Sequence, residues 1–463
     1  MVAHIEHFWR ANFLLFAVAL FDFAHRFHQN RARTIIHPCQ TETPAMPKRE
    51  AKLGFIFVTL LLDILGLGLI IPVLPKLIES FTNNNIESAS TIYGIMIAIY
   101  ALMQFVFAPI LGSLSDQYGR RPVILISLLG AGLDYLLLAF APNLAWLFVG
   151  RVIAGITAAN ITTASAYIVD VSAPADRAKN FGILGVAFGL GFIIGPAIGG
   201  LLGDVGLRVP FLVVAGVTLL NWLYGYFVLP ESLKPENRRP FSWRRANPVG
   251  SLSGLGRYPI VLALVATIVL ASLAQNALQS VWVLYTGFRY DWGTRDVGYS
   301  LAVVGLSAAI VQGGLIGRIV AFFGERKALL VGLAVSVVSF TLYGLAPMGW
   351  MLYVIPFLGA FGSISGPSAQ SIITQNVADN EQGAIQGALT SLNSLTGVVG
   401  PLIATNVFRY FISDAAPVQV PGAAFFVGAL FLLFALGLAI RAFRRLPATA
   451  GQNVSEMPPM ASH

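Results

Sequence analysis

Three ionisable residues, Asp63, Asp134 and Arg151, stand well inside long apolar stretches of the sequence. Burying one charge at mid-membrane depth costs at least about 2.5–3.5 kcal/mol, so charges kept there are candidates for function. A carboxylate in such surroundings can take up and release a proton, because burial and a nearby arginine change its proton affinity in opposite directions. We predict that the three residues take up and release protons as a group. The alternatives are a static Asp134–Arg151 ion pair and a purely structural Asp63.

Sequence spacing puts these three residues at similar depth. Asp134 and Arg151 lie eight residues on either side of the turn at 142–143, which is about 12 Å along a helix. Asp63 follows Lys52 by eleven residues, which is about 16 Å from the opposite membrane face. Spacing alone leaves open whether they face one cavity.

The elements that must hold these charges are apolar runs about as long as a helix that crosses a bilayer. The 463 residues are 56% hydrophobic and 11% charged, and the mean hydropathy is +0.75. Soluble proteins carry roughly 25% charged residues, so a soluble core is excluded. We predict an all-α integral membrane protein whose spans cover residues 53–77, 92–111, 123–140, 144–169, 181–202, 210–229, 259–285, 298–322, 328–345, 350–373, 385–410 and 423–440.

A short polar segment, residues 112–122 (GSLSDQYGRRP), connects the second and third runs. Short loops that carry Lys and Arg face the cytoplasm, which places this 112–122 loop there. An acid paired with an arginine at a helix end can bond and release without large net cost. We predict a gating loop, and the alternative is that the loop only marks topology and stabilises a turn. The residues concerned are Gly112, Asp116, Gly119, Arg120 and Arg121.

Glycines recur every four residues in the fifth run, at Gly191, Gly195 and Gly199, with Pro196 beside them. On a helix these residues make one smooth face that lets another helix approach closely. Generic helix packing is the alternative interpretation of this glycine face, and the resemblance given below is preferred to it.

A constant offset of 205 residues relates the two halves of the sequence, so that Gly112 matches Gly317 and Gly119 matches Gly324. Twelve spans in two six-helix pseudo-repeats of the same orientation follow from it. The predicted parts are a 1–45 N-terminal extension, a 46–230 bundle, a 231–257 linker, a 258–445 bundle and a 446–463 tail.

Lys and Arg are concentrated in the loops on one side of the predicted spans, including the linker. This asymmetry predicts a multi-pass inner-membrane protein with both ends of the helical body in the cytoplasm.

The 112–122 loop, with its pattern G-x-L-x-D-x-x-G-R-R, resembles the signature loop of the major facilitator superfamily, and the glycine face resembles that superfamily's antiporter motif. Further segments resemble the tetracycline/proton antiporters of Gram-negative bacteria: 72–75 (PVLP), 130–135 (GAGLDY), 150–157 (GRVIAGIT), 229–232 (LPES) and 382–387 (QGAIQG). The resemblance implies the major facilitator fold and proton-coupled export of a small amphiphilic drug by alternating access. It also implies essential roles for Asp63, Asp134 and Arg151. The alternative function is a proton-linked importer or exporter of an unrelated small metabolite.

One position departs from the tetracycline exporters. They carry an acidic residue in span nine where this chain has Ser336. The departure favours a different amphiphilic substrate over tetracycline.

Uncharged amides in the second half are candidates for the substrate pocket, because an apolar pocket with a few amides suits an aromatic, hydrogen-bonding solute. Interhelical hydrogen bonding is the equal alternative. The residues are Gln275, Asn276, Gln279, Gln370 and Asn393.

The residues that an enzyme or a metal-binding protein would need are absent from this sequence. The chain has one cysteine, Cys39, no histidine in the predicted spans and no phosphate-binding loop, so we expect no enzyme activity, no metal and no cofactor. The formal net charge is +8, but the basic residues are spread over the loops and do not form a surface that could bind nucleic acid. No nucleic acid is therefore expected as a partner. The expected partners are a small-molecule substrate, protons and the lipid bilayer, and we expect a functional monomer.

Overall fold

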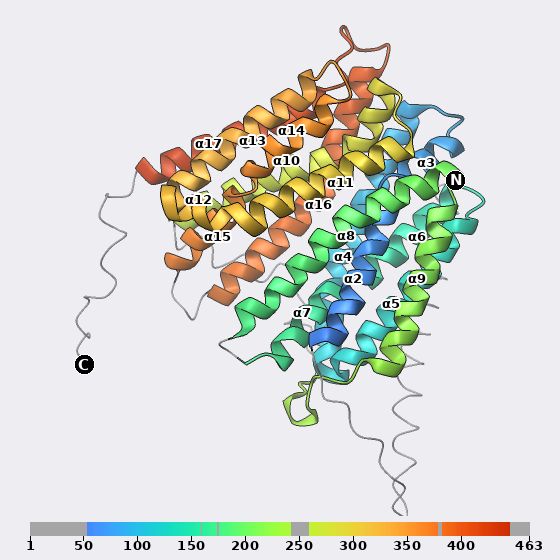
Figure 1. Ribbon diagram of the computed structural model, residues 1–463, viewed down its shortest axis with the longest axis vertical. Helices are drawn as coiled ribbons and strands as arrows, with labels where there is room; N and C mark the ends of the chain where they lie inside the picture. Colours follow the sequence, from blue (N-terminus) through green and yellow to red (C-terminus); the bar gives the residue numbers. More distant parts are fainter. Residues whose placement is uncertain (1–52, 159, 174–175, 242–258, 378–381, 445–463) are drawn as a thin grey trace, which may run out of the picture. The chain divides into compact units, whose positions relative to one another are not determined.

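The structure is a computed structural model, and it describes residues 53–158, 160–173, 176–241, 259–377 and 382–444. The predicted extension 1–45, the linker from residue 242 onward and the tail 446–463 lie outside these residues. All described helices belong to one compact unit, Glu50–His463. Within the described ranges the regular structure is helical (Figure 1).

Twelve stretches of the described chain are long and apolar enough to cross a membrane, which confirms the predicted all-α fold with its spans. In chain order the helices are α2 (Leu53–Ile70), α3 (Leu74–Phe81), α4 (Ile86–Tyr118), α5 (Arg120–Phe140), α6 (Leu144–Thr157), α7 (Asn160–Val171), α8 (Arg177–Val205), α9 (Val209–Val228), η2 (Pro235–Asn237), α10 (Pro259–Tyr290), α11 (Thr294–Ile310), η4 (Val311–Leu315), α12 (Ile316–Phe323), α13 (Glu325–Leu345), α14 (Met351–Gly362), α15 (Ser365–Gln375), α16 (Gln382–Ile412) and α17 (Ala423–Arg444).

Several spans are built from consecutive helices. The first span changes from α2 to α3 around Pro72, because proline has no N–H to donate within a helix. The eighth span passes through the π-helix η4, which contains Gly313 and Gly314. The first irregularity coincides with Pro72 and Pro75 of the sequence, and the second was not predicted.

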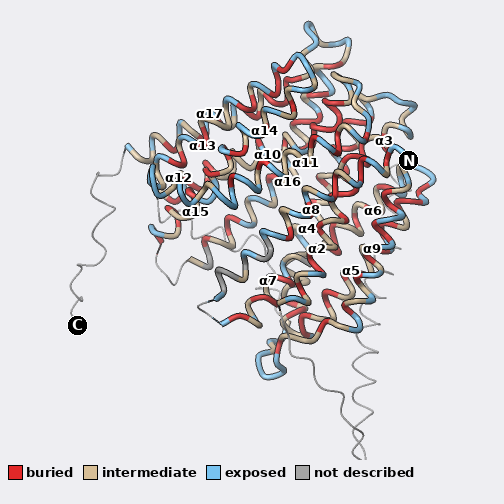
Figure 2. The backbone as a smooth tube through the Cα atoms, viewed as in Figure 1, coloured by how far each residue is buried: buried red, intermediate tan, exposed pale blue. Residues whose placement is uncertain are grey.

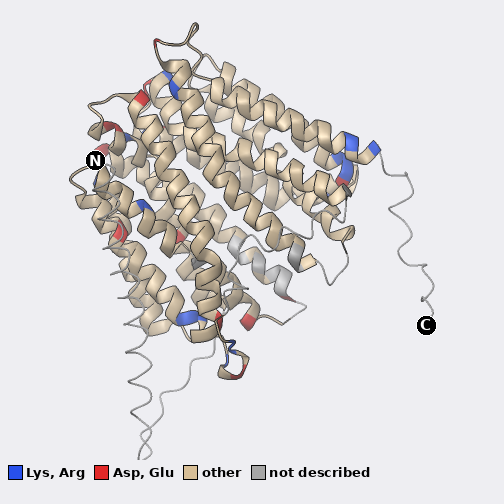
Figure 3. Ribbon diagram, turned by 180° about the vertical axis from the view of Figure 1, so that it is seen from behind, with Lys and Arg blue, Asp and Glu red and all other residues tan. Residues whose placement is uncertain are grey.

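Helix ends define the two ends of the helical body. We call them the Gly119 end, where α4 meets α5, and the Asn143 end, where α5 meets α6. Figure 3 shows Lys, Arg, Asp and Glu gathered mainly near helix ends, with long uncharged stretches between them. Figure 2 shows that exposed residues run along the outer sides of many helices while buried residues face their neighbours.

Two helix pairs make the most extensive contacts between the first half and the second. α8 packs between α2 of its own half and α11 of the other half, and α4 packs against α16. α10 packs against α16 and α17 within the second half. Any movement of one half relative to the other must therefore change the contacts of α8 and α4.

Candidate functional site

Asp134 and Arg151 face each other across the α5–α6 hairpin. Arg151 Nη2 lies 3.4 Å from Asp134 Oδ2, which makes them an ion pair. Asp134 is 1% exposed. Its other oxygen, Oδ1, and Arg151 Nε are buried and have no hydrogen-bond partner among the described residues. The pair is therefore only partly satisfied, which leaves one carboxylate oxygen available.

The absence of a side chain at Gly150 makes room for Asp134. A methyl group at Gly150 would lie 2.7 Å from Asp134 Oδ1 and 2.6 Å from Leu138 Cδ2. Both distances are well inside van der Waals contact, so any larger residue would displace the carboxylate or the leucine.

Asp63 shares its surroundings with this pair. It is partly buried on α2. Tyr100 on α4 and Tyr135 on α5 each interact electrostatically with all three charged residues. The structure thus brings Asp63, Asp134 and Arg151 around the same two tyrosines, a relation that spacing left open. Sequence reasoning did not name Tyr100, and it quoted Tyr135 only within the resembling segment 130–135.

The glycine face of α8 lies against α2 directly after Asp63. A methyl group at Gly191 would meet Ile64 Cγ2 at 2.6 Å, and one at Gly195 would lie 2.8 Å from Gly68 Cα. A methyl group at Gly199 would overlap the carbonyl oxygen of Leu69. Pro196, also inside α8, lies beside Gly68 through its ring. This face lets the two backbones touch next to a membrane carboxylate.

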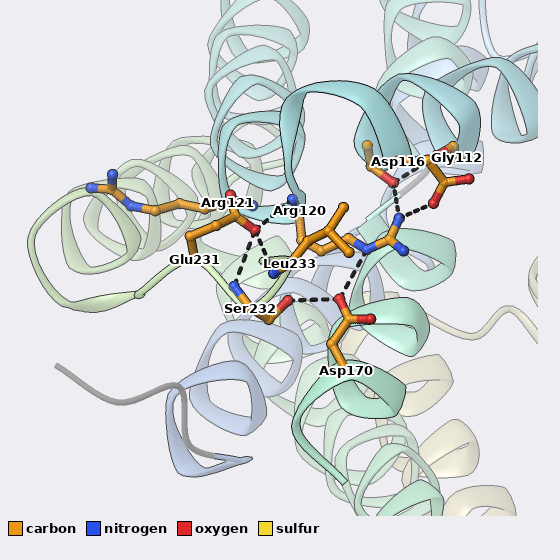
Figure 4. Close-up of polar contacts among 9 residues, drawn as sticks. Gly112, Asp116, Arg120, Arg121, Asp170, Glu231, Ser232 and Leu233 are labelled. Atoms are coloured by element: carbon orange, nitrogen blue, oxygen red, sulfur yellow. Dashed lines mark hydrogen bonds and ion pairs between the residues drawn. The ribbon is translucent and has the colours of Figure 1, made fainter. Parts of the chain in front are cut away.

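Two acids hold Arg120 of the 112–122 loop (Figure 4). Its Nη1 lies 2.6 Å from Asp116 Oδ1, and its Nε lies 3.1 Å from Asp170 Oδ2 on α7. Nη1 also donates to Ser115 Oγ at 2.7 Å. The predicted 112–122 loop is helical on both sides of Gly119, since α4 runs to Tyr118 and α5 begins at Arg120, and we keep its name for this segment. Arg120 is 8% exposed, so α4, α5 and α7 are tied together by a nearly buried guanidinium.

Glu231, which follows α9, stabilises the turn at Gly119 between α4 and α5. Its carboxylate accepts hydrogen bonds from the backbone N–H of Arg120 at 2.8 Å, of Arg121 at 3.3 Å, and of Ser232 and Leu233 at 3.0 Å each. Ser232 Oγ in turn donates to Asp170 Oδ2 at 2.9 Å. The stretch 231–233 is therefore part of the cluster.

Gly119 lets Glu231 reach these N–H groups. Its φ is +107°, in a region that favours glycine, and a methyl group there would overlap Glu231 Oε2. Sequence reasoning quoted Glu231 only within a resembling motif, and it did not name Asp170.

The remaining loop residues have separate partners. Arg121 Nη2 donates to the carbonyl oxygen of Tyr226 at 2.5 Å, and its guanidinium lies 5.9 Å from the ring centre of that tyrosine. Gly112 accepts from Ser115 Oγ at 2.7 Å. The start of the linker also docks here, because the N–H of Arg239 donates to the carbonyl oxygen of Asp116 at 3.1 Å.

The second half repeats this anchor with its charge reversed. Glu325, which matches Arg120 by the offset of 205, accepts from Ser371 Oγ at 2.5 Å and from Gln375 Nε2 at 3.0 Å. Gln375 in turn matches Asp170. An arginine–aspartate contact in one half is therefore a glutamate–glutamine contact in the other.

The five candidate amides fall into two groups. Asn276 Nδ2 donates to Thr396 Oγ1 at 3.1 Å, and Asn393 Oδ1 accepts from Ser272 Oγ at 2.8 Å, so both link α10 to α16. Gln370 on α15 donates to Gln386 on α16. Gln275 and Gln279 are exposed one turn apart on α10. An exposed amide at this depth is costly in lipid, which favours a polar cavity on that side.

Ser336 lies on the side of α13 that meets α14. Its hydroxyl occupies the space that a methyl group at Gly362 would need. A larger acidic side chain would therefore press on the backbone of α14 unless Gly362 moved.

Comparison with known proteins agrees with this architecture. The sequence matches the Major Facilitator Superfamily over residues 56–401 and 308–460. It is 41% identical to the class C tetracycline resistance protein of Escherichia coli, covering 84% of this chain and 96% of that protein. It is 38% identical to the class H tetracycline resistance protein of Pasteurella multocida, covering 77% and 89%.

Solved structures show the same fold. The human organic anion transporter MFSD10 (TETRAN) matches with a TM-score of 0.64 and 25% identity, covering 85% of this chain and 100% of that chain. A bacterial homolog of the human lysosomal transporter Spinster matches with a TM-score of 0.67 and 16% identity, covering 85% and 96%. The chain therefore belongs to the Major Facilitator Superfamily and, within it, to the family of the tetracycline resistance proteins, which are multi-pass membrane transporters and not enzymes.

Proposed function

We propose that this protein exports a small amphiphilic drug in exchange for protons, by alternating access across an inner membrane. The observation that carries the proposal is the partly satisfied Asp134–Arg151 pair beside Asp63 in the membrane-spanning body. An uncompensated charge is costly at this depth, so the pair favours states in which a proton or a rearrangement completes it.

Proton coupling follows from the two oxygens of Asp134. Arg151 contacts Oδ2, and a proton taken up on Oδ1 would neutralise the carboxylate and weaken its hold on Arg151. Asp63 borders the glycine face of α8, so a change in its charge acts directly where α2 and α8 touch. Charge on Asp63 is thereby linked to the packing of α8, and α8 also contacts the second half.

The 112–122 loop is proposed as the gate on the cytoplasmic side. Arg120 holds α4 and α7 through Asp116 and Asp170, and charge-assisted bonds of this kind can re-form after release. With the Gly119 end in the cytoplasm, both ends of the helical body are cytoplasmic too.

The substrate is proposed to be tetracycline or a related aromatic amphiphile, held beside the exposed Gln275 and Gln279. High identity to several tetracycline resistance proteins supports tetracycline as the first compound to test. Ser336 is a reason to test related amphiphiles as well as tetracycline, since a neutral hydroxyl is present where those exporters carry an acid. We further propose that the protein acts as a monomer, with residues 46–230 and 258–445 as its two moving bundles.

Transport in inside-out membrane vesicles tests the proposal. With the vesicle lumen made acidic, labelled tetracycline should accumulate inside, and an ionophore that collapses the pH gradient should abolish the accumulation. Asp134→Asn should remove accumulation while the protein remains in the membrane. Accumulation that continues after the gradient has collapsed would contradict proton coupling. Drug movement only in the opposite direction would identify an importer.

A further inference from the structure

A charged contact joins the two halves at the Asn143 end, far along α8 from the 112–122 loop. Arg295 in the first turn of α11 forms an ion pair with Asp204 near the end of α8, with Nε 2.9 Å from Oδ2. Thr294 Oγ1 lies 3.0 Å from Asp204 Oδ1 and 3.1 Å from the carbonyl oxygen of Gly200. The hydroxyl has one hydrogen, so it donates to one of these acceptors at a time.

Glycines show where α8 and α11 touch and where they do not. At the Asn143 end, a methyl group at Gly200 would lie 2.5 Å from the carbonyl oxygen of Thr294, and one at Gly203 would lie 2.9 Å from Thr294 Cβ. Toward the Gly119 end, methyl groups at Gly185 on α8 and at Gly313 in η4, which continues α11, would meet no atom within 4 Å. The ion pair therefore lies at the end where the two helices are in contact.

We propose that Asp204, Thr294 and Arg295 form a clasp that holds the Asn143 end closed and opens when the transporter exposes its cavity there. This inference rests on the proposed alternating access. The side chains of Arg295 and Asp204 are 56% and 34% exposed, so water can solvate both charges as soon as they separate. Exposed ion pairs contribute little net free energy, which suits a contact that must break and re-form in every cycle.

The first turn of α11 favours an acidic residue at position 204. Asp204 lies beside the first turn of α11, where the unpaired N–H groups of a helix favour negative charge. Arg295 and Thr294 supply the two directed contacts. Closure of this end is thus expected to depend on the charge of Asp204 and Arg295 rather than on their bulk.

Thiol labelling of the full-length protein in membranes tests the clasp. Cys39, the only cysteine of the sequence, is first replaced by serine. One reporter is Val73→Cys, since Val73 is fully buried and lies 3.0 Å from where a methyl group at Gly203 would be. The other is Gly185→Cys, at the open side of α8. Labelling rates of each reporter with a water-soluble maleimide are compared with and without Arg295→Asp.

Arg295→Asp places two acids against each other, so the Asn143 end should open more often. Val73→Cys should label about two- to fivefold faster, the range that exposed ion pairs give, and Gly185→Cys should label more slowly. Asp204→Asn should cause the same opposite changes to a smaller extent. Arg409→Asp, which alters an exposed arginine near the same end but within the second half, is the matched control and should change neither rate.

Opposite changes at the two reporters distinguish a clasp from a contact that only stabilises the fold. Faster labelling of both reporters, or rates equal to those of Arg409→Asp, would overturn the proposal. Labelling needs neither a drug nor a pH gradient, so failure of the proposed drug export would leave this result readable.

Discussion

Asp134 can lie beside Arg151 because position 150 has no side chain. Gly150→Ala would place a methyl group 2.7 Å from Asp134 Oδ1, and the carboxylate would have to turn away from Arg151. We expect proton-driven uptake in inside-out vesicles to fall about tenfold or more, since moving a reacting group by an ångström can cost about a hundredfold.

Gly216→Ala is the control for that change, because position 216 is exposed on α9 and a methyl group there would meet no atom within 4 Å. It should leave transport and expression unchanged. Wild-type uptake by the Gly150→Ala protein would show that Asp134 does not need its present position.

Glu231 gives a second test at single residues. Its carboxylate accepts four backbone N–H groups around the Gly119 turn, and hydrogen bonds to a charged acceptor are the stronger kind. Glu231→Gln keeps the shape but removes the charge, so the turn should hold Arg120 less firmly. We expect a several-fold lower maximal transport rate with little change in drug binding, measured on the same vesicles.

Glu236→Gln is the matched control for Glu231→Gln, since Glu236 is an exposed acid a few residues further along the same segment. Equal rates in the two variants would mean that the carboxylate of Glu231 has no part in gating.

The sequence identified some of these residues and not others for an energetic reason. Asp63, Asp134 and Arg151 stand out because a charge within an apolar run is expensive and has to be explained. Asp170 and Glu231 lie at the ends of helices, where charge is cheap, so nothing in their local sequence marks them. Only the folded chain, which brings α7 and the 231–233 stretch to the 112–122 loop, shows their contacts.

Helix α8 is the element on which most of the proposed mechanism converges, and its glycine face can be tested as a unit. A side chain at Gly199 would press on the backbone of Leu69, which cannot rotate away as a side chain would. Gly199→Val should therefore push α8 from α2, at a cost of about 1–3 kcal/mol for overpacking. The expected result is a lower Tm of the purified protein in detergent together with loss of transport.

Gly189→Val, on the same helix, would meet open space in this structure and should keep the Tm. Loss of stability in both variants would indicate low tolerance of α8 for valine rather than a close approach at Gly199.

At this scale the sequence predicted which segments are helices better than where they bend. Long apolar runs identify spans, but hydropathy places the start of the second span too late, because α4 begins at Ile86 and not at residue 92. There Asn85 caps the helix by accepting from the N–H of Ser88 at 2.8 Å. The π-helix Val311–Leu315 was missed because glycines inside an apolar run are equally common in regular membrane helices.

Across the whole molecule, the halves meet in two copies of the same helix pair. The offset of 205 turns the α8–α11 contact into the α16–α4 contact, and Thr405, which matches Gly200, packs against Gly94. The repeat itself could be predicted from spaced glycines. Which helices meet across the halves could not, because both sides of these helices are apolar and hydropathy does not distinguish lipid from protein.

Arg120 in the first half and Glu325 at the matching position of the second half carry opposite charges, and this has a consequence for how the chain folds during synthesis. Arg120 and Asp170 leave the ribosome first and are paired within the first half. When Glu325 follows, it carries the same sign as Asp170 and is repelled from that finished contact, while Ser371 and Gln375 offer it neutral donors close by in the sequence. A repeat protein with identical anchors could exchange them between its halves. Here the two loops carry opposite charges at the matching positions 120 and 325, so copying the first loop into the second half would add an arginine that competes for Asp170.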